Sequence, residues 1–216
     1  MVIPFLLLLA YLFGSIPSGV WIGKKFFDVD IRQFGSGNIG TTNTFRVLGK
    51  RAGVVVLLCD MFKGTLATLL PVVFHVNNIS PVVFGIFAIL GHTFSIFVRF
   101  KGGKAVATSA GMLLGVAPMF FVYVMVIFTI SLFLTSMVSF SSIAAAAFGF
   151  LGVLLFPVFH CPILANRDWL FTVLIVLLAL FIVLRHRENI ERMKKREENT
   201  IGFGLNLLKN GKKAEK

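Results

Sequence analysis

The sequence predicts an all-α polytopic membrane protein with seven transmembrane helices, one of them short. The chain is 57% hydrophobic and only 14% charged, with a mean hydropathy of +0.91. Residues 105–166 contain no charged side chain, which is enough chain for about three membrane spans of roughly 20 residues each. This composition argues against a soluble domain, a disordered chain and a soluble nucleic-acid-binding protein. No nucleic-acid partner is therefore expected.

Basic side chains predict how the helices are oriented. Of the 21 Lys and Arg residues, six lie within residues 24–51, three within 99–104 and ten after residue 184, whereas residues 75–80 contain none. Loops rich in Lys and Arg stay on the cytoplasmic side of a membrane. The amino terminus is therefore expected outside the cell, and the carboxyl terminus in the cytoplasm.

The first predicted span covers residues 2–22. No Lys or Arg precedes it, and it runs into Gly14, Ser15 and Pro17 instead of a cleavage site, so we expect a retained span and not a signal peptide. The later spans are expected at residues 54–74, 81–98, 105–117, 118–134, 143–159 and 169–184. Breaks at Pro118 and at the polar residues 135–142 give three spans between residues 105 and 159, and this odd number keeps the basic tail inside.

The predicted fourth span is too short to cross a bilayer. Its thirteen residues, 105–117, rise about 20 Å against a hydrocarbon core of about 30 Å. Either it is a half-helix that begins inside the membrane, or the preceding segment dips into a cavity lined by protein. Both alternatives put Gly102, Gly103 and Lys104 near a cavity floor. We expect residues 1–190 to form one membrane domain and residues 191–216 to form a basic cytoplasmic tail that frays into disorder.

A glycine-rich loop at residues 35–43 is the first candidate site. Glycines allow positive φ and close backbone approach, so successive amides can surround an oxyanion, while hydroxyl, amide and guanidinium groups complete the shell. The alternative is an ordinary flexible loop with an Asn cap, and the loop lacks the G-x-x-x-x-G-K-[ST] pattern. The candidate residues are Gly35, Ser36, Gly37, Asn38, Asn43 and Arg46.

A second glycine turn at residues 100–104 repeats this chemistry. Gly102 and Gly103 are followed by Lys104 and then by a helix, whose amino terminus carries about half a positive charge. The sequence therefore predicts a second anion pocket on the same face. A short basic turn that obeys the positive-inside rule is the alternative.

Other ionisable side chains lie at membrane depth or at helix ends. Asp60 and Lys63 share a helix face and are expected to neutralise each other as a scaffolding ion pair, with direct chemistry as the alternative. His92 is expected to be a hydrogen-bonded structural group. His186 and Asn189 share one face near the last span, among arginines that could simply anchor the helix.

Several catalytic signatures are missing. The sequence has no H-E-x-x-H, no carboxylate cluster for a metal and no G-x-S-x-G. The expected site is therefore an anion clamp without a metal or cofactor.

Taken together, these segments resemble the bacterial acyl-phosphate:glycerol-3-phosphate acyltransferase family of integral membrane enzymes. The resemblance covers most of the chain. The matching pieces are GSIPSG at 14–19, residues 35–43 with Arg46, DMFKG at 60–64, GH at 91–92, FKGGK at 100–104 with VAT at 106–108, VSFSS at 138–142 and RHRENI at 185–190.

The resemblance implies a seven-helix fold in the bacterial plasma membrane with its site open to the cytoplasm. It implies transfer of an acyl group from acyl phosphate to glycerol 3-phosphate, giving lysophosphatidic acid, with the enzyme that supplies acyl phosphate as a candidate partner. On this reading the catalytic residues are Ser36, Arg46, Lys104 and His186. The substrate-binding residues would be Gly35, Gly37, Asn38, Asn43, Gly102, Gly103, Ser142 and Asn189.

The chain departs from the family pattern at a few positions. Ser95 stands where a proline is usual, Ala105 where a glycine is common, and Arg196 and Glu197 where Gly-Thr usually precedes the glutamate that is Glu198 here. A phosphate-ester transporter is an alternative function, although a second copy of the 35–43 pattern is absent from the sequence. An acyltransferase that uses acyl-coenzyme A or acyl carrier protein is the other alternative.

Overall fold

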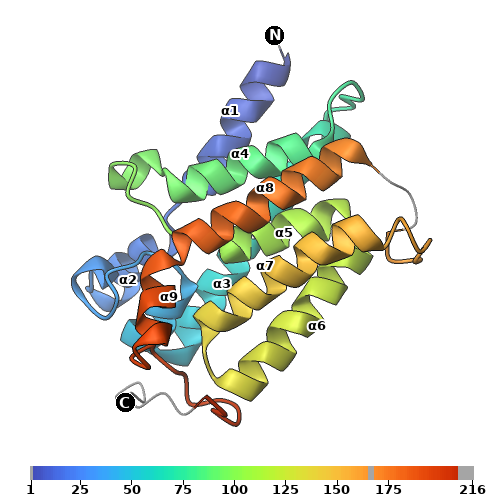
Figure 1. The fold of residues 1–216 in the computed structure, drawn as a ribbon. Coiled ribbons are helices and arrows are strands. Elements are labelled where there is room, and N and C mark those ends of the chain that lie inside the picture. The colour runs from blue at the N-terminus through green and yellow to red at the C-terminus, as the bar shows by residue number, and fades with distance from the viewer. Residues whose placement is uncertain (1, 165–167, 209–216) are drawn as a thin grey trace. The chain divides into compact units, whose positions relative to one another are not determined.

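The computed structural model describes residues 2–164 and 168–208, and their regular secondary structure is helical (Figure 1). The chain divides into two compact units, Met1–Pro118 and Met119–Lys216. The elements of the first unit are α1 Val2–Ser15, α2 Ser18–Phe27, the 3-10 helix η1 Ile31–Gln33, α3 Thr41–Val73, α4 Pro81–Thr93, the 3-10 helix η2 Ile96–Val98 and α5 Val106–Val116. The second unit contains α6 Pro118–Thr135, α7 Val138–Leu155, α8 Trp169–Arg185 and α9 Arg187–Lys194.

The all-helical membrane fold predicted from the sequence is confirmed. Four helical segments in the described residues are long and apolar enough to span a membrane, and two bent pairs, α1 with α2 and α8 with α9, qualify if each is one span. Helix α5 is apolar but has only 11 residues, about 16 Å of rise. The expected short fourth helix is therefore present, while the total of seven spans and the orientation stay predictions.

The first predicted span is not one straight helix. It breaks between Ser15 and Ser18, where α1 and α2 meet at an angle of 48°. Pro17 at this break has no N–H to continue the ladder and disfavours helical backbone in the residue before it. The segment predicted as the first span, residues 2–22, is therefore a bent pair of helices that qualifies as a span when both are taken together.

Helix α3 begins 13 residues before the predicted span at residue 54, at Thr41. It contains Arg46, Lys50 and Arg51, whose charges ended the hydropathy window although they do not end the helix. Hydropathy reports depth in a bilayer, whereas the helix start depends on local backbone bonds. Gly49 has non-helical backbone, with φ +83° and ψ −178°, so α3 consists of two helical stretches that meet at a kink there.

The polar run near residues 135–142 forms a much shorter break than expected. Only Ser136 and Met137 separate α6 from α7, and α7 starts at Val138 instead of residue 143. The hydroxyls of Ser141 and Ser142 donate to the carbonyls of Met137 and Val138 at 2.8 Å, four residues earlier. Serines can stay in a membrane helix in this way, because the helix itself supplies their acceptors.

Glycines bring the helices of the first unit into close contact. An added methyl group at Gly111 of α5 would overlap the Met61 carbonyl of α3, and one at Gly14 of α1 would overlap the Ala88 carbonyl of α4. Lipid tails give apolar helices no hydrophobic drive to associate, so small residues that permit close backbone approach stabilise such pairs. The pairs α3–α5 and α1–α4 are built in this way.

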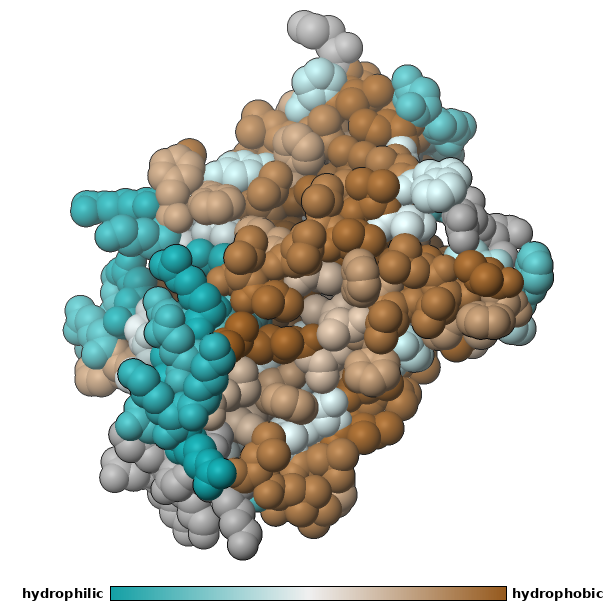
Figure 2. Space-filling model, viewed as in Figure 1, coloured by the Kyte–Doolittle hydropathy of each residue, from teal (hydrophilic) through white to brown (hydrophobic). Residues whose placement is uncertain are grey.

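The second unit packs around aromatic rings. Phe120 of α6 is fully buried, and its ring centroid lies 5.8 Å from Phe171 of α8 and 6.4 Å from Phe156, just after α7. Hydrophobic residues cover the visible faces of α6 and α7, whereas hydrophilic residues gather over α9 (Figure 2). This distribution suits helices α6 and α7 in lipid and α9 outside it.

We expect Gly111→Ala to destabilise the protein by about 1–3 kcal/mol, because the added methyl must push α5 away from α3. Thermal unfolding in detergent should show a midpoint lowered by about 5 °C. Gly149→Ala is the control: its methyl would lie 3.6 Å from Val124, an ordinary contact, and alanine favours the helix. Equal losses in both variants would contradict the close-packing argument.

Candidate active site

The short helix η1 fixes the start of the glycine loop. Asp30 caps it by accepting hydrogen bonds from the backbone N–H of Arg32 at 3.2 Å and from its Nε at 2.8 Å. Lys24 lies 3.3 Å from the same carboxylate. The Arg32 side chain holds the pKa of Asp30 well below its usual range. The resulting stabilisation is complete above about pH 4 and is lost as the pH falls through the depressed folded pKa.

Asn43 holds the loop closed. Its Nδ2 donates to the carbonyls of Ile31 at 2.9 Å and Phe34 at 3.2 Å, and its Oδ1 accepts the backbone N–H of Ser36 at 2.9 Å. The side chain is only 2% exposed. Asn43 was expected to bind substrate. That contact stays a prediction, and the amide that would make it is already committed to the loop backbone.

Two left-handed glycines shape the loop. Gly35 and Gly37 have φ of +60° and +68°. An added methyl group at Gly35 would overlap the Asn43 Oδ1 and would lie 3.2 Å from Cδ of Arg46. The Arg46 side chain therefore runs directly along the loop. Ser36, between the two glycines, has an exposed side chain.

The amino terminus of α3 ends at this loop. Gly40 is its N-cap, and the backbone bonds of the first turn begin with the amides of Asn43 and Thr44, which both donate to the Gly40 carbonyl. The amides of the residues before them point out of the helix end. Asn38 Oδ1 accepts the Gly40 N–H at 2.9 Å and so keeps the loop close to this end. Uncapped amides, a helix dipole and an arginine together suit an anion.

The second glycine turn has a different construction. Arg99, Phe100 and Ala105 all adopt positive φ, while the amides of Gly102 and Gly103 donate to the carbonyls of Thr93 at 2.9 Å and His92 at 3.1 Å. Both glycine amides are therefore occupied by the end of α4. Substrate contact by Gly102 and Gly103 stays a prediction. Both glycines allow the turn to approach His92 closely, since a methyl group at either one would overlap His92.

A buried polar network lies beneath this turn. Asp60, 1% exposed, accepts a hydrogen bond from Ser18 at 3.0 Å and pairs with Lys63 at 2.8 Å. Its Oδ1 lies 3.9 Å from Nδ1 of His92, whose ring packs on Gly103. The predicted Asp60–Lys63 ion pair is confirmed. Lys63 also donates to the Ile16 carbonyl at 2.8 Å, so the pair ties the break between α1 and α2 to α3.

An apolar cluster joins the two glycine segments within the first unit. Val20, Ile31, Ile39 and Val98 are each at most 5% exposed and pack together. Ile39 belongs to the first loop, and Val98 precedes the second turn. Lys104, half-buried, follows directly after that turn. The loop that contains Ile39 and the segment that contains Val98 are thus connected by one apolar cluster.

The second unit carries the remaining predicted residues. His186 is 3% exposed, and its Nδ1 lies 2.8 Å from the Ile182 carbonyl. A carbonyl only accepts, so Nδ1 carries a hydrogen. Ser142 donates to Val138 within its own helix. Asn189 donates through Nδ2 to Glu198 at 2.7 Å.

The sequence alone assigned no role to Glu198. It is 3% exposed, and its two carboxylate oxygens accept from Ser139 at 3.0 Å, Asn189 at 2.7 Å and Arg192 at 2.9 Å. The segment that carries it was expected to be a solvated, fraying tail. At Glu198 and Thr200 the structure differs from this expectation, because both are buried and Glu198 bonds to α7 and α9, whereas residues 202–205, 207 and 208 are exposed as expected. Residues 209–216 of the predicted tail lie outside the described residues.

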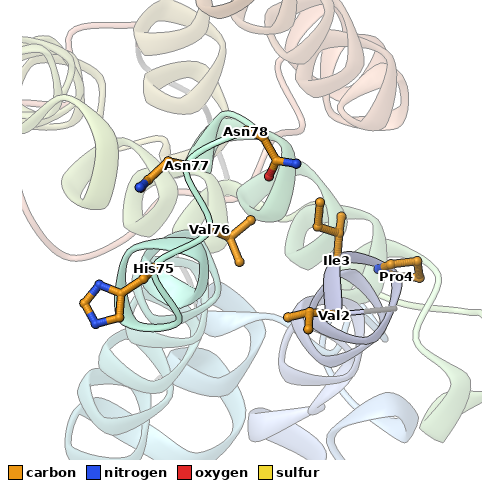
Figure 3. A pocket seen from close by; sticks show the side chains of 7 residues that line it. All are labelled: Val2, Ile3, Pro4, His75, Val76, Asn77 and Asn78. Carbon is orange, nitrogen blue, oxygen red and sulfur yellow. The ribbon is translucent and has the colours of Figure 1, made fainter.

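A cavity of about 670 Å³ lies elsewhere in the first unit (Figure 3). It is at the carboxyl end of α3, the far end of that helix from the glycine loop. None of the predicted site residues lines it. Its lining residues are Val2, Ile3, Pro4, His75, Val76, Asn77 and Asn78. In the described residues, His, Cys, Asp and Glu side chains form no group of three suited to a metal ion.

Glycine-packed helices and two glycine turns with half-buried cations define a polytopic membrane protein suited to anionic ligands. Residues 4–196 match the family model described as glycerol-3-phosphate acyltransferase. The chain belongs to this family and is a bacterial multi-pass membrane acyltransferase, which confirms the resemblance seen in the sequence.

Curated relatives and solved structures agree with this family. The chain is 57% identical over 203 residues to the glycerol-3-phosphate acyltransferase of Streptococcus gordonii, covering 94% of each chain, and 56% identical over 202 residues to that of Streptococcus pneumoniae, with the same coverage. It is also similar to PlsY (YgiH), an integral membrane glycerol 3-phosphate acyltransferase. The glycerol 3-phosphate form of that crystal structure has a TM-score of 0.81 and 34% identity over 92% of this chain and 94% of that one. The lysophosphatidic acid form has a TM-score of 0.79 and 33% identity.

Ala105 keeps the left-handed backbone, with φ +59°, at a position where glycine is common in the family. A non-glycine residue in the left-handed region lowers stability by about 1–2 kcal/mol. Glycine removes this strain, but part of the gain is lost because glycine loses more chain entropy on folding. We therefore expect Ala105→Gly to leave the unfolding midpoint unchanged or raise it. Ala110→Gly, inside α5, should lower stability by about 1 kcal/mol in the same thermal assay. A larger loss for Ala105→Gly than for Ala110→Gly would refute the assignment of backbone strain.

Proposed function

We propose that this protein transfers a fatty acyl group from acyl phosphate to the 1-hydroxyl of glycerol 3-phosphate. The products are lysophosphatidic acid and inorganic phosphate, the first step of phospholipid synthesis. Family membership supports the acceptor, and so do the glycerol 3-phosphate and lysophosphatidic acid forms of the similar PlsY structures. The observation that carries the proposal is Arg46, whose side chain lies along a left-handed glycine loop at an uncapped helix amino terminus.

The glycine loop is assigned to the donor phosphate. Arg46 supplies a permanent positive charge with two parallel donors for phosphate oxygens. The exposed Ser36 hydroxyl and the start of α3 add neutral donors, and Asn38 keeps the loop against the helix end. Asn43 acts as a positioning residue, because its bonds to Ile31, Phe34 and Ser36 hold the loop in place.

The acceptor is assigned to Lys104, Ser142, His186 and Asn189. Lys104 would pair with the phosphate of glycerol 3-phosphate. Asn189 is oriented by the Glu198 carboxylate, and His186 is fixed by the Ile182 carbonyl. The glycine turn at residues 102–103 would position Lys104 through its bonds to the end of α4.

The proposed reaction is a direct displacement. The primary hydroxyl oxygen of the acceptor attacks the acyl carbonyl carbon, and its proton passes to a phosphate oxygen of the donor. The bond between the carbonyl carbon and the phosphate oxygen then breaks, and inorganic phosphate leaves. Arg46 and Lys104 stabilise the developing oxyanion and the leaving phosphate by electrostatics. Phosphate is a good leaving group, so the step needs no metal or cofactor.

The proposed site faces the cytoplasm. The glycine loop and the second turn both lie in segments rich in Lys and Arg, which the positive-inside rule retains on that side. Soluble glycerol 3-phosphate would then reach the site from the cytoplasm, and the lipid-like donor from the membrane or from the enzyme that produces it.

The donor is tested with purified protein in detergent. We expect lysophosphatidic acid from acyl phosphate and glycerol 3-phosphate with a chelator present, and no product from acyl-coenzyme A or acyl carrier protein. Mass spectrometry of the extracted lipid measures the product. Equal product from acyl-coenzyme A would refute the proposed donor. Failure of all three donors, in protein with an unchanged unfolding midpoint, would refute acyl transfer itself.

Single replacements test the two cations. Arg46→Ala and Lys104→Ala should each lower kcat/KM by about a hundredfold or more, because a charge that stabilises the transition state is lost. Matched controls are Arg51→Ala and Lys101→Ala, which remove exposed cations from the same segments. Near-normal turnover in Arg46→Ala or Lys104→Ala would exclude the proposed clamp.

Asn43→Ala separates positioning from direct binding. Loss of its three loop hydrogen bonds should raise KM for the donor. It should also accelerate hydrogen exchange of the Ser36 amide, whose N–H donates to Asn43 Oδ1 at 2.9 Å. Ser36→Ala should lower turnover without this change in exchange. If Asn43→Ala leaves the Ser36 amide protected, the positioning role is wrong.

A further inference from the structure

The chain after α9 folds back onto the end of a membrane-spanning helix. The segment at residues 196–208, called here the return segment, donates three backbone hydrogen bonds to the end of α6 and the turn after it. Ile201 donates to Ser136 at 2.8 Å, Leu205 to Phe133 at 2.7 Å and Leu207 to Leu134 at 2.9 Å. The return segment is thus fixed where α6 leaves the bilayer.

The return segment presents apolar side chains outward at this boundary. Phe203, Leu205, Leu207 and Leu208 are between 49% and 60% exposed. Gly204 has φ +96°, and a methyl group there would overlap the Phe133 carbonyl, so the backbone lies flush on α6. The Phe203 ring also contacts Phe133, with 5.9 Å between centroids. Large apolar side chains are thereby held outward at the end of a spanning helix instead of being buried.

Exposed cations precede these apolar residues. Lys194, Lys195 and Arg196 follow one another at the end of α9, and all three are exposed. An apolar group beside a cluster of lysines and arginines is the combination that binds an anionic bilayer surface, because the apolar side chains enter the interface while the cations attract lipid phosphates. Neither feature alone suffices for stable binding.

The return segment also carries a link to the candidate site. Glu198, near its start, accepts from Ser139 of α7 and from Asn189 of α9. A force that holds the return segment in place therefore also holds the carboxylate that orients Asn189. We infer that the return segment is an interfacial anchor for anionic phospholipid, and that its binding to the bilayer keeps the Glu198–Asn189 pair assembled. The link to turnover rests on the proposed function, whereas anchoring does not.

The test uses the full-length protein in nanodiscs of phosphatidylcholine alone or of phosphatidylcholine mixed with phosphatidylglycerol. Hydrogen exchange of the amides of Ile201, Leu205 and Leu207 is measured by mass spectrometry. We expect exchange about tenfold slower with phosphatidylglycerol. The difference should vanish at about 1 M salt, where the Debye length falls to about 3 Å.

Two variants and one control complete the test. K194Q/K195Q should lose the response to phosphatidylglycerol, and L205S/L207S should exchange fast in both lipids, while their unfolding midpoints in detergent stay near that of the parent. K50Q/R51Q removes two exposed cations from α3 and should respond as the parent does. A parent protein whose exchange ignores lipid charge, or whose protection follows protein concentration instead, overturns the inference.

Turnover gives an independent readout. In the parent, phosphatidylglycerol should raise kcat severalfold, and K194Q/K195Q should show no such rise. If exchange responds to lipid charge but no donor gives lysophosphatidic acid, the proposed function fails and the anchor stands. If product forms but exchange does not respond, the anchor fails and the proposed function stands.

Discussion

The structure depends on one constraint: backbone that leaves a helix near a membrane must find its hydrogen-bond partners inside the protein. The first glycine loop meets it through Asn43, which supplies one acceptor and two donors to the loop backbone. The second turn meets it through the last carbonyls of α4, to which Gly102 and Gly103 donate. The two turns are therefore rigid features that the rest of the first unit holds in place, and glycine is needed where carbonyls and side chains approach too closely for a methyl group.

Buried charged side chains also need partners inside the protein. Asp60 and Lys63 neutralise each other, and Ser18 and the Ile16 carbonyl satisfy further hydrogen-bonding groups of the pair. Removal of one partner would leave a buried charge uncompensated, which is costly, so the pair acts as a scaffold. In the second unit Glu198 plays the corresponding part, with Asn189 and its neighbours as donors. Each unit thus contains a buried carboxylate close to residues of the candidate site.

The two glycine turns differ in what they offer a ligand. The first leaves a helix amino terminus and an arginine beside its exposed serine, whereas the second has its glycine amides occupied and presents Lys104 as its cation. A phosphate at the first can be bound by backbone and side chain together. A phosphate at the second depends on the lysine charge. This difference supports the assignment of a different substrate to each turn. It also makes the second turn more sensitive to a single replacement, that of Lys104.

The sequence by itself determined the helical membrane fold, the short α5, the Asp60–Lys63 pair and the family, because hydropathy, helical spacing and ordered motifs are local properties. Only the tertiary structure decided that α3 begins at Thr41, that the first span bends at Pro17 and that serines of the 135–142 run stay helical. It also decided that Asn43 and the glycine amides bond to backbone, and that Glu198 is buried. Each of these depends on which acceptor lies within hydrogen-bond reach once distant segments pack, and spacing along the chain carries no record of that distance.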